Sequence, residues 1–390
     1  MEKLINITGK ALSGEWGIDD EEGIGIPVLR TTNFTNDGII DYSNVITRTI
    51  TKKNIADKFL RKGDIIIEKS GGSDNKPVGR VVYFDNDENK YLFNNFTGLL
   101  RVKDTTKWLP KYIFYSLFAN YQSGGTRRYE NKTTGLHNLQ TDFYVKDFEI
   151  KEISYGEQIE ICELFDGITD LIDKRKRQLE KLDELVKARF IEMFGGIHDS
   201  KMYPYKTVKE LTEVISGGTP SRDVSEYWEE GTIPWVKTTE LHNNVVTKVE
   251  EYITEKGLNN SSAKIVPVGT VLVAMYGQGK TRGMTAYLEI KACTNQACAC
   301  ILPSDKINQK FLWYFFILSY DNLRDLAKGG NQPNLNGNMI KTYPILYPPI
   351  ELQNQFAAFV KQVDKSKFEI KQSLEKLELL KKALMQKYFG

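Results

Sequence analysis

Apolar residues follow two kinds of pattern along the chain, and each kind occurs twice. Short β-branched runs, such as DIIIE at 64–68 and TVLVA at 270–274, lie among Gly, Asn and Asp residues, which predicts strands joined by turns. A stripe of apolar residues at helical spacing follows in each half, at 110–121 and at 312–320, and predicts one buried helix per half. Each half is therefore predicted to be a globular α+β unit.

Each half ends in a longer helical pattern, at 157–194 and at 352–388. Its apolar residues recur at alternating steps of three and four with Glu and Lys between them, which is typical of a helix that packs against a second helix. At about 1.5 Å per residue, each helix would span on the order of 55 Å. Two helices packed separately on their own domains are the alternative, but the matching stripes favour an antiparallel coiled coil. The predicted fold is α+β, with two globular domains separated by this helix pair and related by a pseudo-twofold internal repeat.

The repeat is also visible in the letters of the sequence. IPVLRTTNF at 26–34 returns as IPWVKTTEL at 233–241, and LEKLDELVKARFIEMFG at 179–195 matches LEKLELLKKALMQKYFG at 374–390 in nine of seventeen positions. Three weaker echoes lie between these anchors in the same order: KGDIIIE with VGTVLVA, KYIFYSLF with KFLWYFFI, and HNLQ with PNLN. An internal duplication follows. The predicted boundaries are 1–155 for the first globular domain, 156–195 for the first long helix, 196–350 for the second domain and 351–390 for the second helix.

Length and composition agree with two soluble domains. The 390 residues exceed what one hydrophobic core usually supports. The start MEKLINITGK lacks an apolar leader and the longest apolar run, at 311–318, is too short to cross a bilayer, so a cytoplasmic protein is expected. Four cysteines, three of them in CTNQACAC, suit a reducing compartment. A net charge of only +2 still allows nucleic acid as a partner, because phosphate binding depends on local clusters of Lys and Arg.

Three segments of the second half carry a specific resemblance. They are ISGGTPSRDVSEYWEEGTIPWVKTTEL at 215–241, NQPNLN at 331–336 and YPPIELQNQF at 347–356. Together they resemble the specificity subunit of type I restriction-modification enzymes, and the first half carries sparser versions, LSGEWG at 12–17 and SYGEQIE at 154–160. The resemblance covers essentially the whole chain.

The resemblance implies a division of labour with other subunits. Each globular unit would be a target recognition domain that reads one half of a bipartite DNA site, and the long helices would fix the spacer and dock two modification subunits. The chain itself would be non-catalytic and hold no cofactor. S-adenosylmethionine would belong to the modification subunits, and ATP and Mg to the restriction subunits.

Candidate contacts with double-stranded DNA are the Arg, Lys, Asn, Gln and His residues of four loops and of the repeated phrase, since Arg pairs well with guanine and Asn or Gln with adenine. The loops are 68–80, 124–138, 276–283 and 328–338. The candidates are Arg30, Lys69, Lys76, Arg80, Arg127, Arg128, Asn131, Lys132, His137, Asn138, Lys237, Lys280, Arg282, Asn331, Gln332, Asn334 and Asn336. The alternative for the loops is a solvated surface, and for Arg30 and Lys237 an internal salt bridge.

Other chemistry finds little support in the sequence. AMYGQGKT at 274–281 fits a relaxed phosphate-loop pattern, but RGMTAYLEIK follows with strand-like alternation where that loop requires a helix. CTNQACAC has no His nearby and aligns with a predicted buried strand, which argues against zinc. We therefore expect no catalytic, cofactor or metal site. A methyltransferase or nuclease with unrecognised motifs and a coiled-coil interaction scaffold remain the alternatives.

Overall fold

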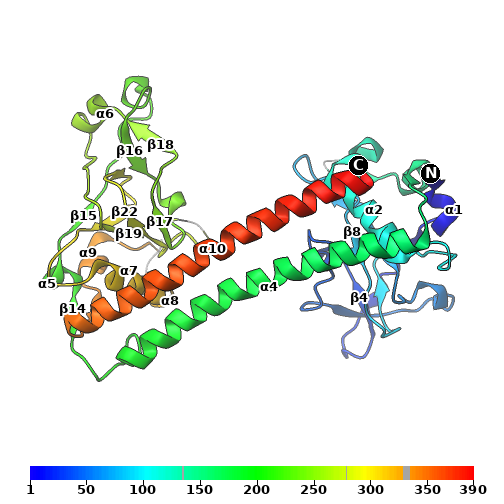
Figure 1. The fold of residues 1–390 in the computed structure, drawn as a ribbon, viewed down its shortest axis with the longest axis horizontal. Coiled ribbons are helices and arrows are strands. Elements are labelled where there is room, and N and C mark those ends of the chain that lie inside the picture. The colour runs from blue at the N-terminus through cyan, green and yellow to red at the C-terminus, as the bar shows by residue number, and fades with distance from the viewer. Residues whose placement is uncertain (134–135, 278, 328–333) are drawn as a thin grey trace. The chain divides into compact units, whose positions relative to one another are not determined.

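The computed structural model describes residues 1–133, 136–277, 279–327 and 334–390 (Figure 1). The chain forms two compact units, one of residues 1–176 with 372–390 and the other of residues 177–371. The two long helices, α4 (Tyr155–Phe194) and α10 (Ile350–Phe389), each contribute one part to each unit. Their bounds agree with the predicted helices to within two residues.

Among the described residues, the first unit contains four small sheets around one buried helix. Its four-stranded antiparallel sheet has the order β2 (Leu12–Ser13), β10 (Thr97–Leu100), β6 (Ile65–Glu68), β8 (Val81–Tyr83). A second sheet has the order β3 (Ile18–Asp19), β5 (Ile46–Thr49), β4 (Ile26–Leu29), β9 (Leu92–Phe93). The smaller sheets are β11 (Glu130–Thr133), β12 (Leu136–Leu139), β7 (Ser70–Gly72), and the pair β1 (Glu2–Lys3), β13 (Glu149–Ile150). The helices are α1 (Leu4–Thr8), α2 (Pro110–Gln122) and α3 (Thr141–Asp147), with 3-10 turns at Thr31–Asn33, Ala56–Lys58 and Gly125–Tyr129.

The second unit repeats this plan. Its main sheet has the order β15 (Val214–Ser216), β22 (Cys298–Ile301), β19 (Val271–Ala274), β20 (Thr285–Leu288), β17 (Asn244–Val246). The others are β18 (Glu251–Ile253), β16 (Ile233–Val236), β21 (Cys293–Thr294), and the pair β14 (Tyr205–Thr207), β23 (Pro344–Leu346). The helices are α5 (Val208–Leu211), α6 (Glu255–Asn259), α7 (Gln309–Leu318), α8 (Tyr320–Leu326) and α9 (Gly337–Lys341), with 3-10 turns at Ser225–Tyr227 and Thr238–Glu240.

Strand register confirms the duplication residue by residue. The repeated phrase forms β4 in one unit and β16 in the other, and each of these strands pairs in parallel with a short buried strand, β9 or β21. In the main sheets, Ile66 pairs with Leu99 and Leu272 with Cys300 in the same antiparallel arrangement. The Thr-Thr of the phrase opens a 3-10 turn in both units.

The heptad residues of the long helices pack aromatic rings against each other and against the buried helices. In the first unit, Phe165 near the start of α4 lies 5.7 Å from Phe389 at the end of α10, measured between ring centroids. In the second unit, Phe190 near the end of α4 lies 5.4 Å from Phe356 near the start of α10. In each unit the beginning of one long helix therefore packs against the end of the other, which confirms the predicted antiparallel arrangement.

A buried glutamine attaches each long helix to the loops around the buried helix of its unit. Gln158 accepts a hydrogen bond from the backbone N–H of Leu109 at 2.8 Å and donates to the carbonyl of Lys107 at 3.0 Å. Gln353 accepts from the N–H of Asn308 at 2.9 Å and donates to the carbonyl of Pro348 at 2.8 Å. The two glutamines occupy equivalent positions in the repeat, and both are almost completely buried.

No helix in the described part of the chain combines the length and the apolar content that a membrane span requires.

Candidate nucleic-acid interface

The two candidate loops of the first unit come together in one sheet. Strand β7, from the loop 68–80, pairs with β12, and β12 pairs with β11, both from the segment 124–138. Asn138 is the partner of Ser70 on one side and of Asn131 on the other, and the N–H of Leu139 donates to the carbonyl of Lys69 at 2.8 Å. Segments about 60 residues apart in the sequence are therefore neighbouring strands of one sheet.

Buried polar contacts hold these strands in place. The Glu130 carboxylate accepts a hydrogen bond from the N–H of Val78 at 3.0 Å and lies 2.9 Å from His137 Nδ1. The side chains of Glu130 and His137 are only 3% and 6% exposed. Arg127 Nη2 donates to the carbonyl of Asp74 at 3.1 Å, which ties the 3-10 turn after α2 to the same loop. His137 thus lies inside the supporting network rather than on its surface.

Four of the described candidate side chains in the first unit are exposed and belong to this sheet or to the segments next to it. Lys76, Arg127, Arg128 and Asn131 are exposed. Arg128 stacks over the ring of Tyr129 with its Cζ 4.6 Å from the ring centroid. Lys76 makes no side-chain hydrogen bond or ion pair with any described residue. An unpaired, solvated cation of this kind is free to neutralise an anionic ligand.

Two further candidates belong to the same segments. Lys69 is half-buried and donates to Ser13 Oγ at 3.0 Å, and burial lowers the pKa of its ammonium group. Lys132 belongs to β11.

The guanidinium groups of Arg80 and Arg30 make hydrogen bonds within the first unit. Arg80 donates to the carbonyls of Phe34 at 2.8 Å and Thr31 at 2.9 Å, and it lies 3.2 Å from the buried carboxylate of Glu68. Burial raises the pKa of Glu68 even though Arg80 opposes the shift. Arg30 donates to the carbonyl of Asn44 at 3.1 Å. These contacts fix the turn after β4 against the end of β6.

The second unit joins the corresponding segments in the same way. The N–H of Leu335 donates to the carbonyl of Met275 at 3.0 Å, the counterpart of the Leu139–Lys69 bond. In the loop 276–283, Lys280 is exposed and Arg282 is half-buried. Neither side chain has a hydrogen bond or ion pair to the described part of the chain. Strand β20 follows this loop directly, as predicted, so no helix stands where a phosphate loop needs one.

The remaining candidates of this unit belong to the segment 328–338. Asn331 and Gln332 lie outside the described residues. Asn334 is half-buried, and the side chain of Asn336 accepts a hydrogen bond from the N–H of Met339 at 3.0 Å as the N-cap of α9.

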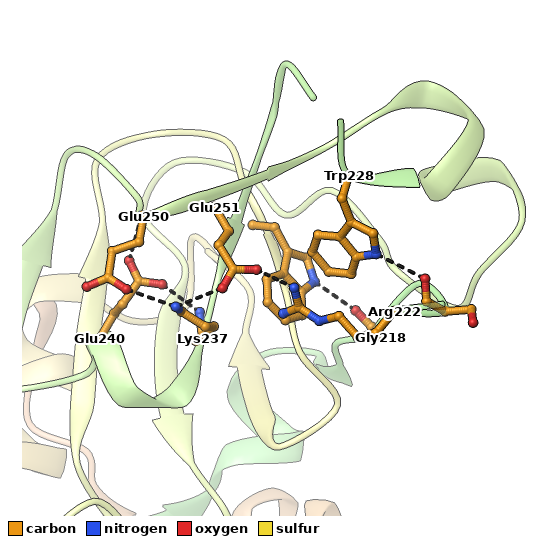
Figure 2. Close-up of polar contacts among 9 residues, drawn as sticks. Gly218, Arg222, Trp228, Lys237, Glu240, Glu250 and Glu251 are labelled. Atoms are coloured by element: carbon orange, nitrogen blue, oxygen red, sulfur yellow. Dashed lines mark hydrogen bonds and ion pairs between the residues drawn. The ribbon is translucent and has the colours of Figure 1, made fainter. Parts of the chain in front are cut away.

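Lys237 of the repeated phrase lies in a row of side chains of alternating charge, which we call the charge row: Glu250, Lys237, Glu251 and Arg222 (Figure 2). Its Nζ is 2.8 Å from a carboxylate oxygen of Glu250 and 2.8 Å from one of Glu251, and Glu251 is also 2.5 Å from Arg222. These carboxylates raise the pKa of Lys237. Burial opposes ionisation of Glu251, but the hydrogen bonds from Lys237 and Arg222 outweigh it and lower its pKa.

Two aromatic rings pack against Arg222, at one end of the charge row. Arg222 Cζ lies 3.6 Å from the ring centroid of Trp228 and 4.8 Å from that of Trp235. The indole N–H of Trp235 donates to the carbonyl of Gly218 at 3.0 Å, as Figure 2 shows for the labelled Gly218. The salt bridge left open by the sequence is therefore the contact that Lys237 makes.

The cysteines of CTNQACAC are buried in β21 and β22. Burial raises the pKa of Cys293 to about 12 and that of Cys300 to about 11, so the thiols stay protonated at neutral pH. Within the described ranges, no group of three or more His, Cys, Asp or Glu side chains is placed to hold a metal ion.

Comparison with known families decides the identity of the repeat. The family model for the type I restriction modification DNA specificity domain matches this chain twice, at residues 3–183 and 201–381. The chain belongs to the type I restriction-modification DNA specificity family. It carries one specificity domain in each half, so the family predicted from the sequence is confirmed.

Individual relatives agree with this assignment. The MjaIX specificity subunit of Methanocaldococcus jannaschii is 31% identical over 194 residues, 48% of this chain and 44% of that protein. The EcoR124I/EcoR124II specificity subunit of Escherichia coli is 24% identical over 276 residues, 67% of this chain and 65% of that protein. The aligned part thus spans less than two thirds of either relative. A crystal structure of a type I S subunit from M. genitalium has the same fold, with a TM-score of 0.60, 16% identity, and coverage of 100% of this chain and 95% of that one.

Several residues that shape this specificity-family chain carried no signal of their own. Gln158 and Gln353 appear as ordinary polar residues at the start of helices, although aligning SYGEQIE with PPIELQNQ places them at the same position. Tyr320 and Arg324 of α8 follow an apolar run and look like its continuation, yet both bond to the loop that carries Lys280. Only the three-dimensional arrangement identifies these partners.

Proposed function

We propose that the chain recognises a bipartite DNA sequence as the non-catalytic specificity subunit of a type I restriction-modification complex. Each specificity domain reads one half-site in the major groove, and the long helices set the unread spacer between the halves. The observation that carries this proposal is the recurrence of one arrangement in both units. A loop with at least one unpaired cation among the described residues is joined by a backbone hydrogen bond to the segment after the buried helix, at Lys69–Leu139 and at Met275–Leu335.

The candidate residues divide into two groups by their contacts. Side chains that are exposed or lack protein partners are assigned to DNA: Lys76, Arg127, Arg128, Asn131, Lys280 and Arg282. Lys69, Lys132, Asn138, Asn331, Gln332 and Asn334 complete the proposed surface from the same segments. Residues whose side chains fix a turn, a sheet or a helix end are assigned to positioning: Arg30, Arg80, His137, Lys237 and Asn336. Arg127 has both roles, because it is exposed and also donates to the carbonyl of Asp74. This division predicts that the first group controls affinity and the second the geometry of the loops.

The long helices are the proposed docking platform for two modification subunits. Leu185 of α4 and Leu380 of α10 occupy equivalent positions in the repeat and are 48% and 47% exposed. A matching exposed leucine in each unit suits two copies of one partner, because each copy would meet the same surface. The restriction subunits, S-adenosylmethionine and ATP would enter the complex through these partners, and no residue of this chain is assigned to them.

Exchange of one domain tests the proposal. Residues 1–155 are replaced by the corresponding domain of another specificity subunit, the chain is coexpressed with its modification subunits, and the modified bases are mapped. One half of the recognised sequence should change while the other half and the gap persist. An unchanged motif, or one altered in both halves, contradicts the proposal.

Two other outcomes point to the alternatives. Methyl transfer by the isolated chain would favour a stand-alone methyltransferase. An assembled complex without salt-dependent DNA affinity would favour an interaction scaffold.

A further inference from the structure

Two residues of α8 hold the loop that carries Lys280 and Arg282. Tyr320 Oη donates a hydrogen bond to the carbonyl of Lys280 at 2.7 Å. Arg324 Nη1 donates to the carbonyl of Arg282 at 2.9 Å and lies 3.2 Å from Tyr320 Oη. The two side chains therefore bind alternate carbonyls of the loop and also contact each other.

The loop returns to the sheet directly beneath these side chains. Gly283 has a φ of +86°, and its N–H donates to the carbonyl of Ala274 at 2.9 Å. A Cβ at Gly283 would lie 3.4 Å from both Tyr320 and Arg324, which is van der Waals contact with the two side chains. The left-handed turn favours glycine here. The α8 side chains thus fix the path of the loop as well as its carbonyls.

These bonds reach only the main chain of the loop. The side chains of Lys280 and Arg282 make no hydrogen bond or ion pair with the described part of the chain. The α8 contacts therefore hold the loop and leave both cations unpaired. Base readout needs side chains that are unpaired but extend from a fixed backbone, because the starting point of each side chain is then set before DNA binds.

In the first unit, different residues anchor the corresponding loop. Gly79, the counterpart of Gly283, has a φ of +100°, and a Cβ there would lie 2.9 Å from Thr126 of the 3-10 turn after α2. Arg127 of that turn donates to the carbonyl of Asp74. In both units the segment after the buried helix therefore anchors the candidate DNA loop through its main chain.

We propose that Tyr320 and Arg324 are positioning residues that set base discrimination in the half-site read by the second unit. This inference rests on the proposed function, because it assigns a role within DNA readout. Without one of these hydrogen bonds the loop also adopts other conformations, and the population of the conformation that reads the bases falls a few-fold. Phosphate attraction, which depends on charge, is unaffected by that loss.

The experiment uses the full chain assembled with its modification subunits. Dissociation constants are measured for the target DNA and for DNAs substituted in one half-site only, at two salt concentrations. Tyr320→Phe keeps the ring against Gly283 and removes one hydroxyl. It should lower discrimination in the half-site of the second unit by about two- to tenfold. Discrimination in the other half-site and the salt dependence should not change.

Tyr314→Phe is the matched control. It removes the hydroxyl of a tyrosine in the neighbouring helix α7 that donates to Asp364 at 2.7 Å and makes no hydrogen bond to the loop. This control should lower the stability of the complex while leaving discrimination in both half-sites at the wild-type value. Arg324→Lys keeps the charge but reaches the carbonyl of Arg282 less well, so it should fall between wild type and Arg324→Ala.

Three results overturn the inference, and a fourth overturns the proposed function. Wild-type discrimination in Tyr320→Phe would show that the bond does not position the loop. Equal losses in both half-sites, or an equal loss in Tyr314→Phe, would show a general structural effect. Absence of discrimination in the unsubstituted complex would overturn the proposed function itself, and the two failures are distinguishable because this last result precedes any substitution.

Discussion

Replacing Gln353 by Ala should loosen the second unit selectively. Its side chain accepts the N–H of Asn308 before α7 and donates to the carbonyl of Pro348 before α10, and it is only 1% exposed. Alanine cannot make either bond, so the N–H of Asn308 and the carbonyl of Pro348 both lose this partner. The attachment of α10 to the loop that begins α7 would then be broken.

The magnitude follows from the groups left without partners. A buried donor or acceptor that loses its partner costs about 1 to 3 kcal/mol, so two such groups give about 2 to 6 kcal/mol. Since the chain has two units, a single unfolding free energy is not well defined, and a local measurement is preferable. A local loss of about 2 kcal/mol corresponds to an increase in opening of about 30-fold.

Amide hydrogen exchange read by mass spectrometry supplies that measurement. Peptides from α7 should exchange about 30-fold faster or more in Gln353→Ala, while peptides from α2 keep their wild-type rate. Gln158→Ala should show the reciprocal pattern, and Gln355→Ala, at an exposed position two residues away, should change neither. Equal acceleration in both units, or none in α7, would show that these glutamines do not attach each helix to its own unit.

Three further predictions concern charge and reactivity. The pKa of Glu251 is lowered in the folded state, so its stabilising contribution is present above its unfolded pKa of about 4.3 and is lost as pH falls through the lower folded value. In Glu251→Gln, the free energy of unfolding should therefore fall less steeply as pH drops below about 4. An unchanged pH dependence in this range would contradict the prediction. Lys76→Ala and Lys280→Ala should each reduce the slope of log K against log salt in the assembled complex by up to about 0.9 for each phosphate that the lysine neutralises, and unaltered slopes would remove these lysines from the interface. Cys293, whose pKa is raised to about 12, should resist iodoacetamide at pH 8 until the protein is denatured, and rapid native labelling would show that the thiol is accessible.

The duplicated scaffold could be predicted from the sequence because periodicity records burial. Strands such as 271–274 are buried along their whole length, and the heptad residues of the long helices pack on rings within each unit. Both patterns repeat in the same order, so the two α+β units and their helices follow from spacing alone.

The roles of individual cations could not be predicted in the same way. Lys237 and Lys280 look alike in the sequence, yet Lys237 lies between two carboxylates and Lys280 is exposed with no partner among the described residues. The difference depends on Glu250 and Glu251, whose approach to Lys237 is set by the pairing of β16 with β18. A pairing between separate strands decides which cation remains free.

The repeated phrase illustrates the same division. Its Thr-Thr pair forms a 3-10 turn in both units, and the side chain of Asn33 or Glu240 accepts the N–H of the preceding cation, Arg30 or Lys237. That bond uses only the backbone of the cation, so the local turn does not require Arg or Lys there. The shared turn is predictable from the letters, whereas the separate partners of the two side chains are not.

The most direct test of two-part recognition is to map the bases modified by the complete complex across a whole genome. If each specificity domain reads one half-site, the map will show one motif made of two short specified halves separated by a gap of fixed length, with modification in both halves. A continuous motif, a gap of variable length, or modification without a common sequence would contradict two-part recognition.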